Sequence, residues 1–160
     1  MRTMSRLATA SLLCLIASPS LAAHHGDSVQ DCWKPAFEAA DANAVAACYA
    51  EDAVLWLPGA PKMQGREAIR AGYADFFGHF SIKRMTLTEA GSIAGGEHVT
   101  AWGSFELVMV SKADGSEVTQ VGRYTDVSRQ VDGHWVYVVD HASDDPPAAA
   151  DAEADAAPAD

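Results

Sequence analysis

Two charged residues near the C-terminal end of the sequence, Arg123 and Asp140, are the best candidates for chemistry. A carboxylate near the mouth of an apolar pocket can act as a base, and a guanidinium beside it would orient an anionic or carbonyl-bearing ligand. The alternative is an ion pair that only tethers the last strand, because structural ion pairs also perturb pKa values.

A hairpin brings these two residues together. The dipeptide Asp132-Gly133 is a turn signal between strands expected from about residue 117 to 129 and from 134 to 141. A two-residue turn puts Val131 opposite His134. Successive pairs then put Thr125 opposite Asp140 on the same face of the sheet.

This register predicts which side chains face the pocket. Arg123 is diagonal to Asp140, and Val127 and Val138 share their face, which we take to be the interior one. The predicted site therefore has Arg123 and Asp140 as its catalytic residues.

A bulge at the turn would change this assignment. It flips the register, because successive residues of a strand point to opposite faces. Three other side chains would then face inward: Tyr124, Asp126 and His141. Both registers remain open at the level of the sequence.

Three helices are expected before these strands. Apolar residues recur at helical spacing between residues 27 and 40, and again between 66 and 77. Pro35 should bend the first helix or mark a late start, since proline removes a backbone hydrogen bond. A shorter helix follows the polar break at Asp41, with Asn43 as its N-cap.

The rest of the chain predicts strands. An apolar run over 53–57, stopped by Pro58-Gly59, indicates a buried strand. Residues 81–88 and 99–109 have strand composition or alternation, and Asp114-Gly115 marks a further hairpin. We predict an α+β domain in which three helices cover one face of a curled antiparallel sheet.

Both ends of the chain differ from this domain. Residues 1–22 are typical of a signal peptide: two arginines precede an apolar stretch that is too short to span a membrane. We expect cleavage after Ala22 or Ala23 and a periplasmic or secreted protein with no membrane anchor. The domain then covers residues 23–143. Residues 144–160 hold only Asp, Glu, Ala and Pro, which predicts a disordered acidic tail.

The charge balance excludes some partners. The chain has 11 basic and 22 acidic residues and a net charge of −11. A nucleic-acid partner is not expected, because such a chain releases no counterions from phosphates. No glycine-rich phosphate loop, CxxC pair or HExxH helix is present, so we expect no cofactor.

The cysteines fit an exported protein. After cleavage, Cys32 and Cys48 remain as a pair on neighbouring helices. An oxidising compartment would allow a disulfide between them. The alternative is two buried free thiols, since cysteine packs well as a small apolar residue.

A metal site is conceivable only at the new N-terminus. Cleavage after Ala22 would give a chain that begins Ala-His-His, whose amine and imidazole nitrogens can wrap Cu(II) or Ni(II). Most such termini are simply flexible. We therefore assign no metal-ligating residue in the domain.

Several segments resemble one superfamily. In order along the chain they are YAEDAVL at 49–55, Pro58-Gly59, GREAIR at 65–70, GRYTDV at 122–127, DGHW at 132–135 and VDH at 139–141. Their order and spacing resemble SnoaL-like and ketosteroid-isomerase-like domains of the nuclear transport factor 2-like superfamily. The resemblance implies a cone-shaped α+β barrel with a pocket at its open end and, often, a homodimer. It does not imply one reaction, because this fold hosts several.

The residues depart from the steroid isomerases of that superfamily. Their aspartate base falls on Leu57 here, and their oxyanion-stabilising tyrosine on the first helix falls on Trp33. The carboxylic acid that assists this tyrosine in the isomerases falls near residues 125–127, the segment that contains Asp126. Tyr73 resembles a tyrosine that lines their pocket. Steroid isomerase activity is therefore not expected, since it needs a base within reach of the substrate carbon.

Two functional hypotheses follow. The first is an exported domain that binds a small, mostly apolar molecule in its cone and performs acid–base chemistry with Asp140. The second is a non-catalytic, dimeric interaction module whose cone is filled by its own side chains. An open cavity with polar groups converging on it would favour the first hypothesis.

Overall fold

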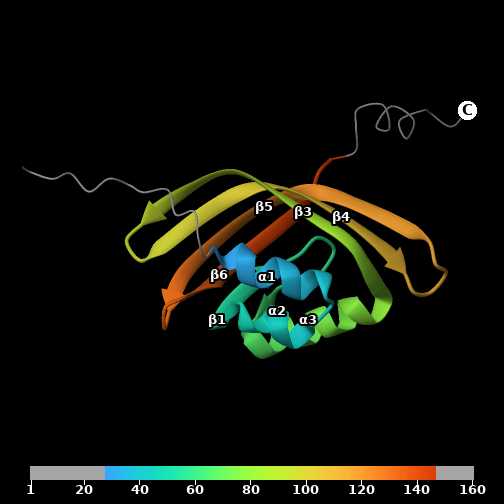
Figure 1. The fold of residues 1–160 in the computed structure, drawn as a ribbon, viewed down its shortest axis with the longest axis horizontal. Coiled ribbons are helices and arrows are strands. Elements are labelled where there is room, and N and C mark those ends of the chain that lie inside the picture. The colour runs from blue at the N-terminus through green and yellow to red at the C-terminus, as the bar shows by residue number, and fades with distance from the viewer. Residues whose placement is uncertain (1–27, 147–160) are drawn as a thin grey trace, which may run out of the picture.

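In the computed structural model, which describes residues 28–146, three helices lie on the concave side of one curved six-stranded sheet (Figure 1). The helices are α1 (Val29–Glu38), α2 (Ala42–Ala47) and α3 (Arg66–His79). The strands are β1 (Tyr49–Trp56), β2 (Met63–Gln64), β3 (Phe80–Gly95), β4 (His98–Ser111), β5 (Glu117–Val131) and β6 (His134–Asp144). The expected α+β class, with helices on one sheet face, is confirmed.

The structure describes only part of the two terminal segments for which the sequence predicted a signal peptide and an acidic tail. The predicted signal peptide, the His24-His25 pair and residues 147–160 of the acidic tail lie outside the described residues. At the C-terminal end, β6 continues to Asp144, one residue beyond the expected domain boundary. None of the described helices has the length and apolar character that a membrane crossing requires.

The helix ends follow local hydrogen bonding. The Ser28 N–H donates to the Asp31 carboxylate at 2.7 Å, which secures the start of α1. Pro35 lies within α1. The prediction of Asn43 as N-cap of α2 is wrong. Asp41 takes this role, because its Oδ1 accepts from the Asn43 and Ala44 N–H groups at 3.0 Å.

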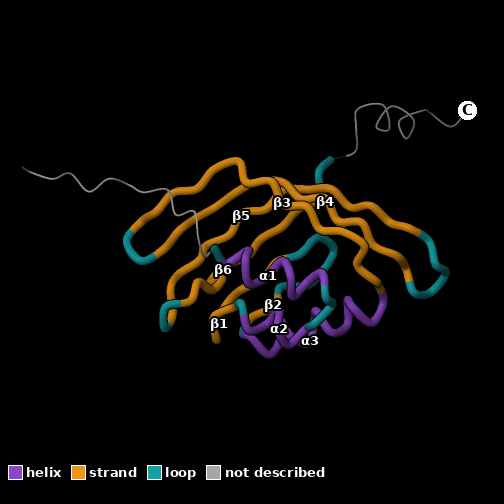
Figure 2. Tube along the Cα trace, in the orientation of Figure 1, coloured by secondary structure: helices purple, strands orange, loops and turns teal. Residues whose placement is uncertain are grey.

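The sheet is mixed rather than wholly antiparallel. Its strand order is β2-β1-β6-β5-β4-β3. Figure 2 shows the long strands β3, β4 and β5 arching over α1. β1 pairs with β6 in parallel, with Leu55 opposite Asp140. The expectation of an antiparallel sheet fails at this pair because β1 and β6 are far apart in the sequence and no hairpin turn joins them.

The register of the last hairpin differs from the expected one. Val131 does pair with His134, as the two-residue turn requires. The register then shifts between Val127 and Ser128, and Asp140 pairs with Asp126. The predicted pairing of Thr125 with Asp140 is therefore wrong. β6 carries one extra residue at Val138, a bulge within the strand and not at the turn.

A disulfide joins the first two helical segments. Cys32 in α1 is bonded to Cys48 at the end of α2, and their Cα atoms are 5.9 Å apart. Cys48 is fully buried, next to the fully buried Tyr49 that begins β1. The bond therefore ties α1 to the start of β1.

Candidate functional site

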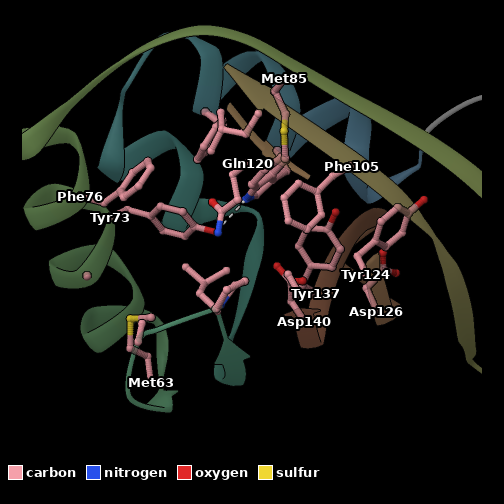
Figure 3. Close-up of a pocket in the computed structure, with 18 of the residues that line it drawn as sticks. Met63, Tyr73, Phe76, Met85, Phe105, Gln120, Tyr124, Asp126, Tyr137 and Asp140 are labelled. Carbon is pink, nitrogen blue, oxygen red and sulfur yellow. Dashed lines mark hydrogen bonds between the residues drawn. The ribbon is translucent and has the colours of Figure 1, made fainter. Parts of the chain in front are cut away.

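A cavity of about 450 Å³ lies between the helices and the concave face of the sheet. Its walls are mostly apolar and aromatic, with rings from α1, α3 and the long strands. Polar groups from β5 and β6 converge at one end, where Figure 3 shows Asp126 and Asp140 beside Tyr124 and Tyr137. The cone is therefore not filled by its own side chains.

Four residues of the preferred predicted site line this cavity: Trp33, Leu57, Tyr73 and Asp140. Trp33 comes from α1 and Tyr73 from α3, and both are almost fully buried. Leu57 follows β1 and presents only an apolar side chain. The position that resembles the isomerase base therefore supplies no proton acceptor.

The other residues of the preferred predicted site lie elsewhere. Thr125 and Val127 line a separate groove on the opposite face of the sheet, together with Trp56 and Val139. Their predicted place in the pocket is wrong, because the bulge changes which β6 residues face inward. Val138 is the bulged residue and lines neither the cavity nor this groove.

Arg123 is also outside the cavity. Its side chain is exposed and pairs with Asp145 at 2.7 Å. It pairs with Ser143 in the sheet, on the face opposite Tyr124. The expected pairing of Arg123 with Asp140 in one site is thus contradicted, and the guanidinium has no part in the polar end of the cavity.

Asp126 takes the place next to Asp140. The two residues pair directly across β5 and β6 and both line the cavity. Asp126 is only 2% exposed. Burial, together with the negative charges of Asp140 and Glu89, raises its pKa from 3.8 to about 8.

Asp140 is easier to ionise than Asp126. Burial raises its pKa to about 6, while a hydrogen bond from Tyr49 and the nearby His141 oppose this rise. At neutral pH the pair therefore holds one proton, on Asp126, and one negative charge, on Asp140. Two facing carboxyls with separated pKa values form an acid and a base.

A chain of hydrogen bonds ends on Asp140. The Tyr49 hydroxyl donates to Asp140 Oδ2 at 2.6 Å, and the Tyr49 and Tyr73 hydroxyl oxygens are 3.0 Å apart. Trp33 Nε1–H donates to the Tyr73 hydroxyl at 3.3 Å. Since Tyr49 has a single proton and gives it to Asp140, Tyr73 must donate to Tyr49. Burial raises the pKa of both tyrosines, so both hydroxyls keep their protons.

Backbone contacts hold Tyr49 in place. The Arg66 guanidinium, at the start of α3, donates from Nε and Nη2 to the Tyr49 carbonyl at 2.9 and 2.7 Å. The adjacent Gly65 N–H donates to the Ala53 carbonyl at 2.8 Å. Arg66 also forms an ion pair with Glu51. The start of β1 is thus fixed to α3, which carries Tyr73.

A second polar pair lies beside Asp126. Gln30 in α1 donates from Nε2 to the Tyr124 hydroxyl at 3.1 Å, and both residues line the cavity. Burial, partly offset by this hydrogen bond, raises the Tyr124 pKa. The Tyr124 hydroxyl accepts from Gln30, so its own proton can be donated.

The alternative register had placed Tyr124, Asp126 and His141 inward. Tyr124 and Asp126 do line the cavity, whereas His141 lines the separate groove. Sequence reasoning assigned neither Tyr49 nor Gln30 to the site. The burial of β5 alternates strictly around Gly122, Tyr124, Asp126 and Ser128. The sequence predicts that alternate residues of this strand share a face, but it does not show which of the two sets faces the cavity. A glycine at 122 hints at the answer, because a side chain there would meet Phe105 and the Ser143 carbonyl on the inner face.

The described residues include no group of three or more His, Cys, Asp or Glu side chains placed to hold a metal ion. Asp126 and Asp140 are two carboxyls without a third ligand. The arrangement is suited to proton transfer.

Solved structures share this fold. A ketosteroid isomerase-like protein from Erwinia carotovora atroseptica is 22% identical with a TM-score of 0.67, and the match covers 74% of this chain and 92% of that one. A nuclear transport factor 2-like superfamily protein from Salmonella enterica is 15% identical with a TM-score of 0.64, covering 76% and 89%. A Mycobacterium tuberculosis protein of unknown function is 18% identical with a TM-score of 0.66, covering 77% and 70%.

At these identities the structures establish the fold alone. Among proteins with curated functions, none matches the sequence. The family model of the SnoaL-like domain, however, matches residues 29–138. This match covers most of the chain and nearly all of the described fold, and the chain therefore belongs to the family of SnoaL-like domains.

Proposed function

We propose that the protein binds a small, largely apolar molecule in its cavity and transfers a proton on it with Asp140 and Asp126. The observation that carries this proposal is the pairing of the two carboxyls inside an apolar cavity of about 450 Å³. The volume lies within the range of small-molecule sites. An apolar wall also excludes water, which strengthens the electrostatic interactions of the pair.

The chemistry that fits is enolisation of a ketone. Asp140 accepts a proton from the carbon beside the carbonyl, while protonated Asp126 donates a hydrogen bond to the developing oxyanion. Asp140 then returns its proton to the same or to another carbon of the ligand. The sequence of steps consumes no co-reactant and can move a double bond without net loss of atoms.

The test is hydrogen–deuterium exchange on a probe ketone. The mature protein is incubated with 1-tetralone in D2O, and loss of the proton signal beside the carbonyl is followed by NMR. We expect Asp140→Asn to slow the protein-dependent exchange by at least about 100-fold, since positioned acid–base groups contribute this much. Asp126→Asn should slow it as well, because the amide is a weaker donor to an oxyanion.

The matched control is Asp52→Asn. Asp52 is an exposed carboxylate on β1, outside the cavity, and the substitution removes the same charge. Exchange in this variant should equal that of the wild type. An Asp140→Asn variant that binds 1-tetralone and exchanges it at the wild-type rate would overturn the assignment of the base.

We propose in addition that two copies associate through the outer groove. Trp56 is 44% exposed there, beside Val127 and Val139, and such apolar patches on a sheet mark interaction surfaces. Light scattering should give twice the monomer mass for the wild type and the monomer mass for Trp56→Glu. Ile93→Glu, which changes an exposed apolar residue outside the groove, should remain dimeric.

The same groove would serve the alternative function, that of a non-catalytic dimeric module. If the monomeric Trp56→Glu variant still exchanges the protons of 1-tetralone, then catalysis in the cavity is independent of dimerisation through the groove. Export is proposed from the sequence of residues 1–22. N-terminal sequencing of the protein from a periplasmic fraction should give a start at Ala23 or His24.

A further inference from the structure

The polar groups of the cavity fall into two walls that differ in their hydrogen-bonding capacity. We infer that the cavity selects hydroxy-ketones, whose hydroxyl donates to the wall of Tyr73 and Asp140 and whose carbonyl accepts from the wall of Tyr124 and Asp126. The inference rests on the proposed function, since it names the ligand class of the same cavity.

The hydrogen-bond chain from Trp33 to Asp140 has no donor left for a ligand in the cavity. The single N–H of Trp33 is given to Tyr73, and the single proton of Tyr49 is given to Asp140. The Tyr73 proton is therefore given to Tyr49, 3.0 Å away. Every proton of this chain is used inside the protein.

This hydrogen-bond chain leaves one strong acceptor, Asp140 Oδ1, for a ligand in the cavity. Tyr49 binds Asp140 at Oδ2, and no hydrogen bond from a described residue ends on Oδ1. Asp140 lines the cavity, so this oxygen can receive a proton donor from a ligand. A ligand carbonyl placed against Asp140 Oδ1 would leave both oxygens without a hydrogen, which is costly in a buried site.

The second wall has the opposite character. Tyr124 accepts from Gln30 and keeps its own proton to donate. Asp126, almost fully buried opposite a second carboxyl, holds the one proton of the pair at neutral pH. Both side chains line the cavity. A ligand carbonyl finds two donors here.

No lysine or arginine alters this balance, since none of the described lining residues is Lys or Arg. His79 lies at the end of α3, and its Nδ1 is 2.8 Å from the Asp75 carbonyl oxygen of its own helix. A carboxylate ligand would meet Asp140 without a counter-ion. The ligand class is therefore uncharged, with one hydroxyl and one carbonyl on an apolar skeleton.

The experiment compares affinities of matched probes by calorimetry: 1-tetralone, 3-hydroxy-1-tetralone, 4-hydroxy-1-tetralone and 4-methoxy-1-tetralone. In the wild type, one of the hydroxy compounds should bind about tenfold more tightly than 1-tetralone, as expected for a hydrogen bond to a carboxylate. The methoxy compound should lose this gain, because it keeps the oxygen and lacks the proton.

The Tyr49→Phe variant tests the direction of the chain. Without the Tyr49 oxygen, the Tyr73 hydroxyl has no internal acceptor and becomes a donor to the cavity. The preference for the hydroxy compound should fall to about twofold, while 1-tetralone binds more tightly than it does to the wild type. Tyr73→Phe is a second variant, which frees the Trp33 N–H instead and should reduce the preference likewise.

Tyr124→Phe is the matched control, the same chemical change on the second wall. It should weaken all four ketones alike and leave the tenfold preference intact. If neither hydroxy compound binds the wild type better than 1-tetralone, or if Tyr49→Phe keeps the full preference, the inferred ligand class is wrong. If none of the probes binds, the proposed function itself fails.

Discussion

The role of each carboxyl is decided by its neighbours. Asp140 and Asp126 stand side by side on β6 and β5, yet only Asp140 receives a hydrogen bond from a hydroxyl. A donor to the ionised form favours ionisation. Asp126 has no such hydroxyl donor and lies beside the negative charge of its partner. The pair thus has a base and an acid by position.

The first prediction concerns Tyr49→Phe and the pKa of Asp140. The substitution removes the hydroxyl that donates to Oδ2 and keeps the buried ring. The pKa of Asp140 should rise from about 6 by roughly one unit, since the ionised form loses a hydrogen bond. The carboxyl carbon of Asp140, followed by 13C NMR across a pH titration, gives this value directly.

The same variant should change the pH profile of proton exchange. The base form of Asp140 is lost at a higher pH, so the acid limb moves upward by the same amount. Tyr124→Phe should leave both the NMR titration of Asp140 and the acid limb in place. A Tyr49→Phe protein in which Asp140 titrates at its wild-type pH would show that the chain does not control the base.

At the scale of elements, the disulfide links the parts that position this chain. Cys32 is adjacent to Trp33 in α1, and Cys48 is adjacent to Tyr49 in β1. Two members of the hydrogen-bond chain, Trp33 and Tyr49, thus lie next to the disulfide in sequence. Loosening α1 should affect the Trp33–Tyr73 contact before it affects the sheet.

The second prediction is that removing this bond destabilises the fold without abolishing it. The cysteines are 16 residues apart, and closing a loop of this size restricts the unfolded chain. Cys32→Ala with Cys48→Ala should lower the free energy of unfolding by about 3 kcal/mol. Urea denaturation followed by fluorescence measures the difference.

Reductant provides the control for that measurement. It should bring the wild type to the stability of the double variant and leave the double variant unchanged. A wild-type protein whose unfolding curve does not respond to reductant would contradict the stabilising role of the bond.

The sequence predicted most elements because their patterns are local. Periodic apolar residues located α1 and α3, and the Asp132-Gly133 turn located the last hairpin with Val131 opposite His134. The parallel pairing of β1 with β6 was not predicted, since it joins residues 85 to 88 positions apart and leaves no local signal.

The candidate site was predicted only in part for a similar reason. A single extra residue in β6 moves Arg123, Thr125 and Val127 away from the cavity and brings Asp126 into it. A bulge within a strand depends on how the sheet curves over the helices, which no short pattern encodes. Trp33 and Tyr73 were found through the family resemblance, which carries positions across the whole fold.

At the scale of the whole molecule, two sources of negative charge act on stability. The chain carries a net charge of −11, and self-repulsion of exposed charges grows with pH. The buried pair acts differently, because it binds protons more tightly in the folded state than in the unfolded state. Salt screens the first effect and leaves the second largely intact.

The third prediction separates these effects by the pH dependence of unfolding. Between the ordinary pKa of 3.8 and the folded value of about 8, folded Asp126 holds a proton that the unfolded chain has released. The free energy of unfolding must therefore fall as pH rises through this window, and the fall ends above about pH 8. Asp140 adds a smaller fall that ends near pH 6.

Asp126→Asn removes the larger contribution because the amide does not titrate. The variant should be no more stable than the wild type near about pH 4, and more stable by about 3 kcal/mol near about pH 9, where the wild type has to bury a second charge. Urea denaturation at a constant ionic strength of about 0.15 M measures this difference while surface repulsion is screened. Asp52→Asn removes an exposed charge of the same kind and should follow the wild-type curve across the range. If the curves of Asp126→Asn and the wild type stay parallel from acid to alkaline pH, then Asp126 does not hold a proton in the folded protein, and the acid of the proposed pair is lost.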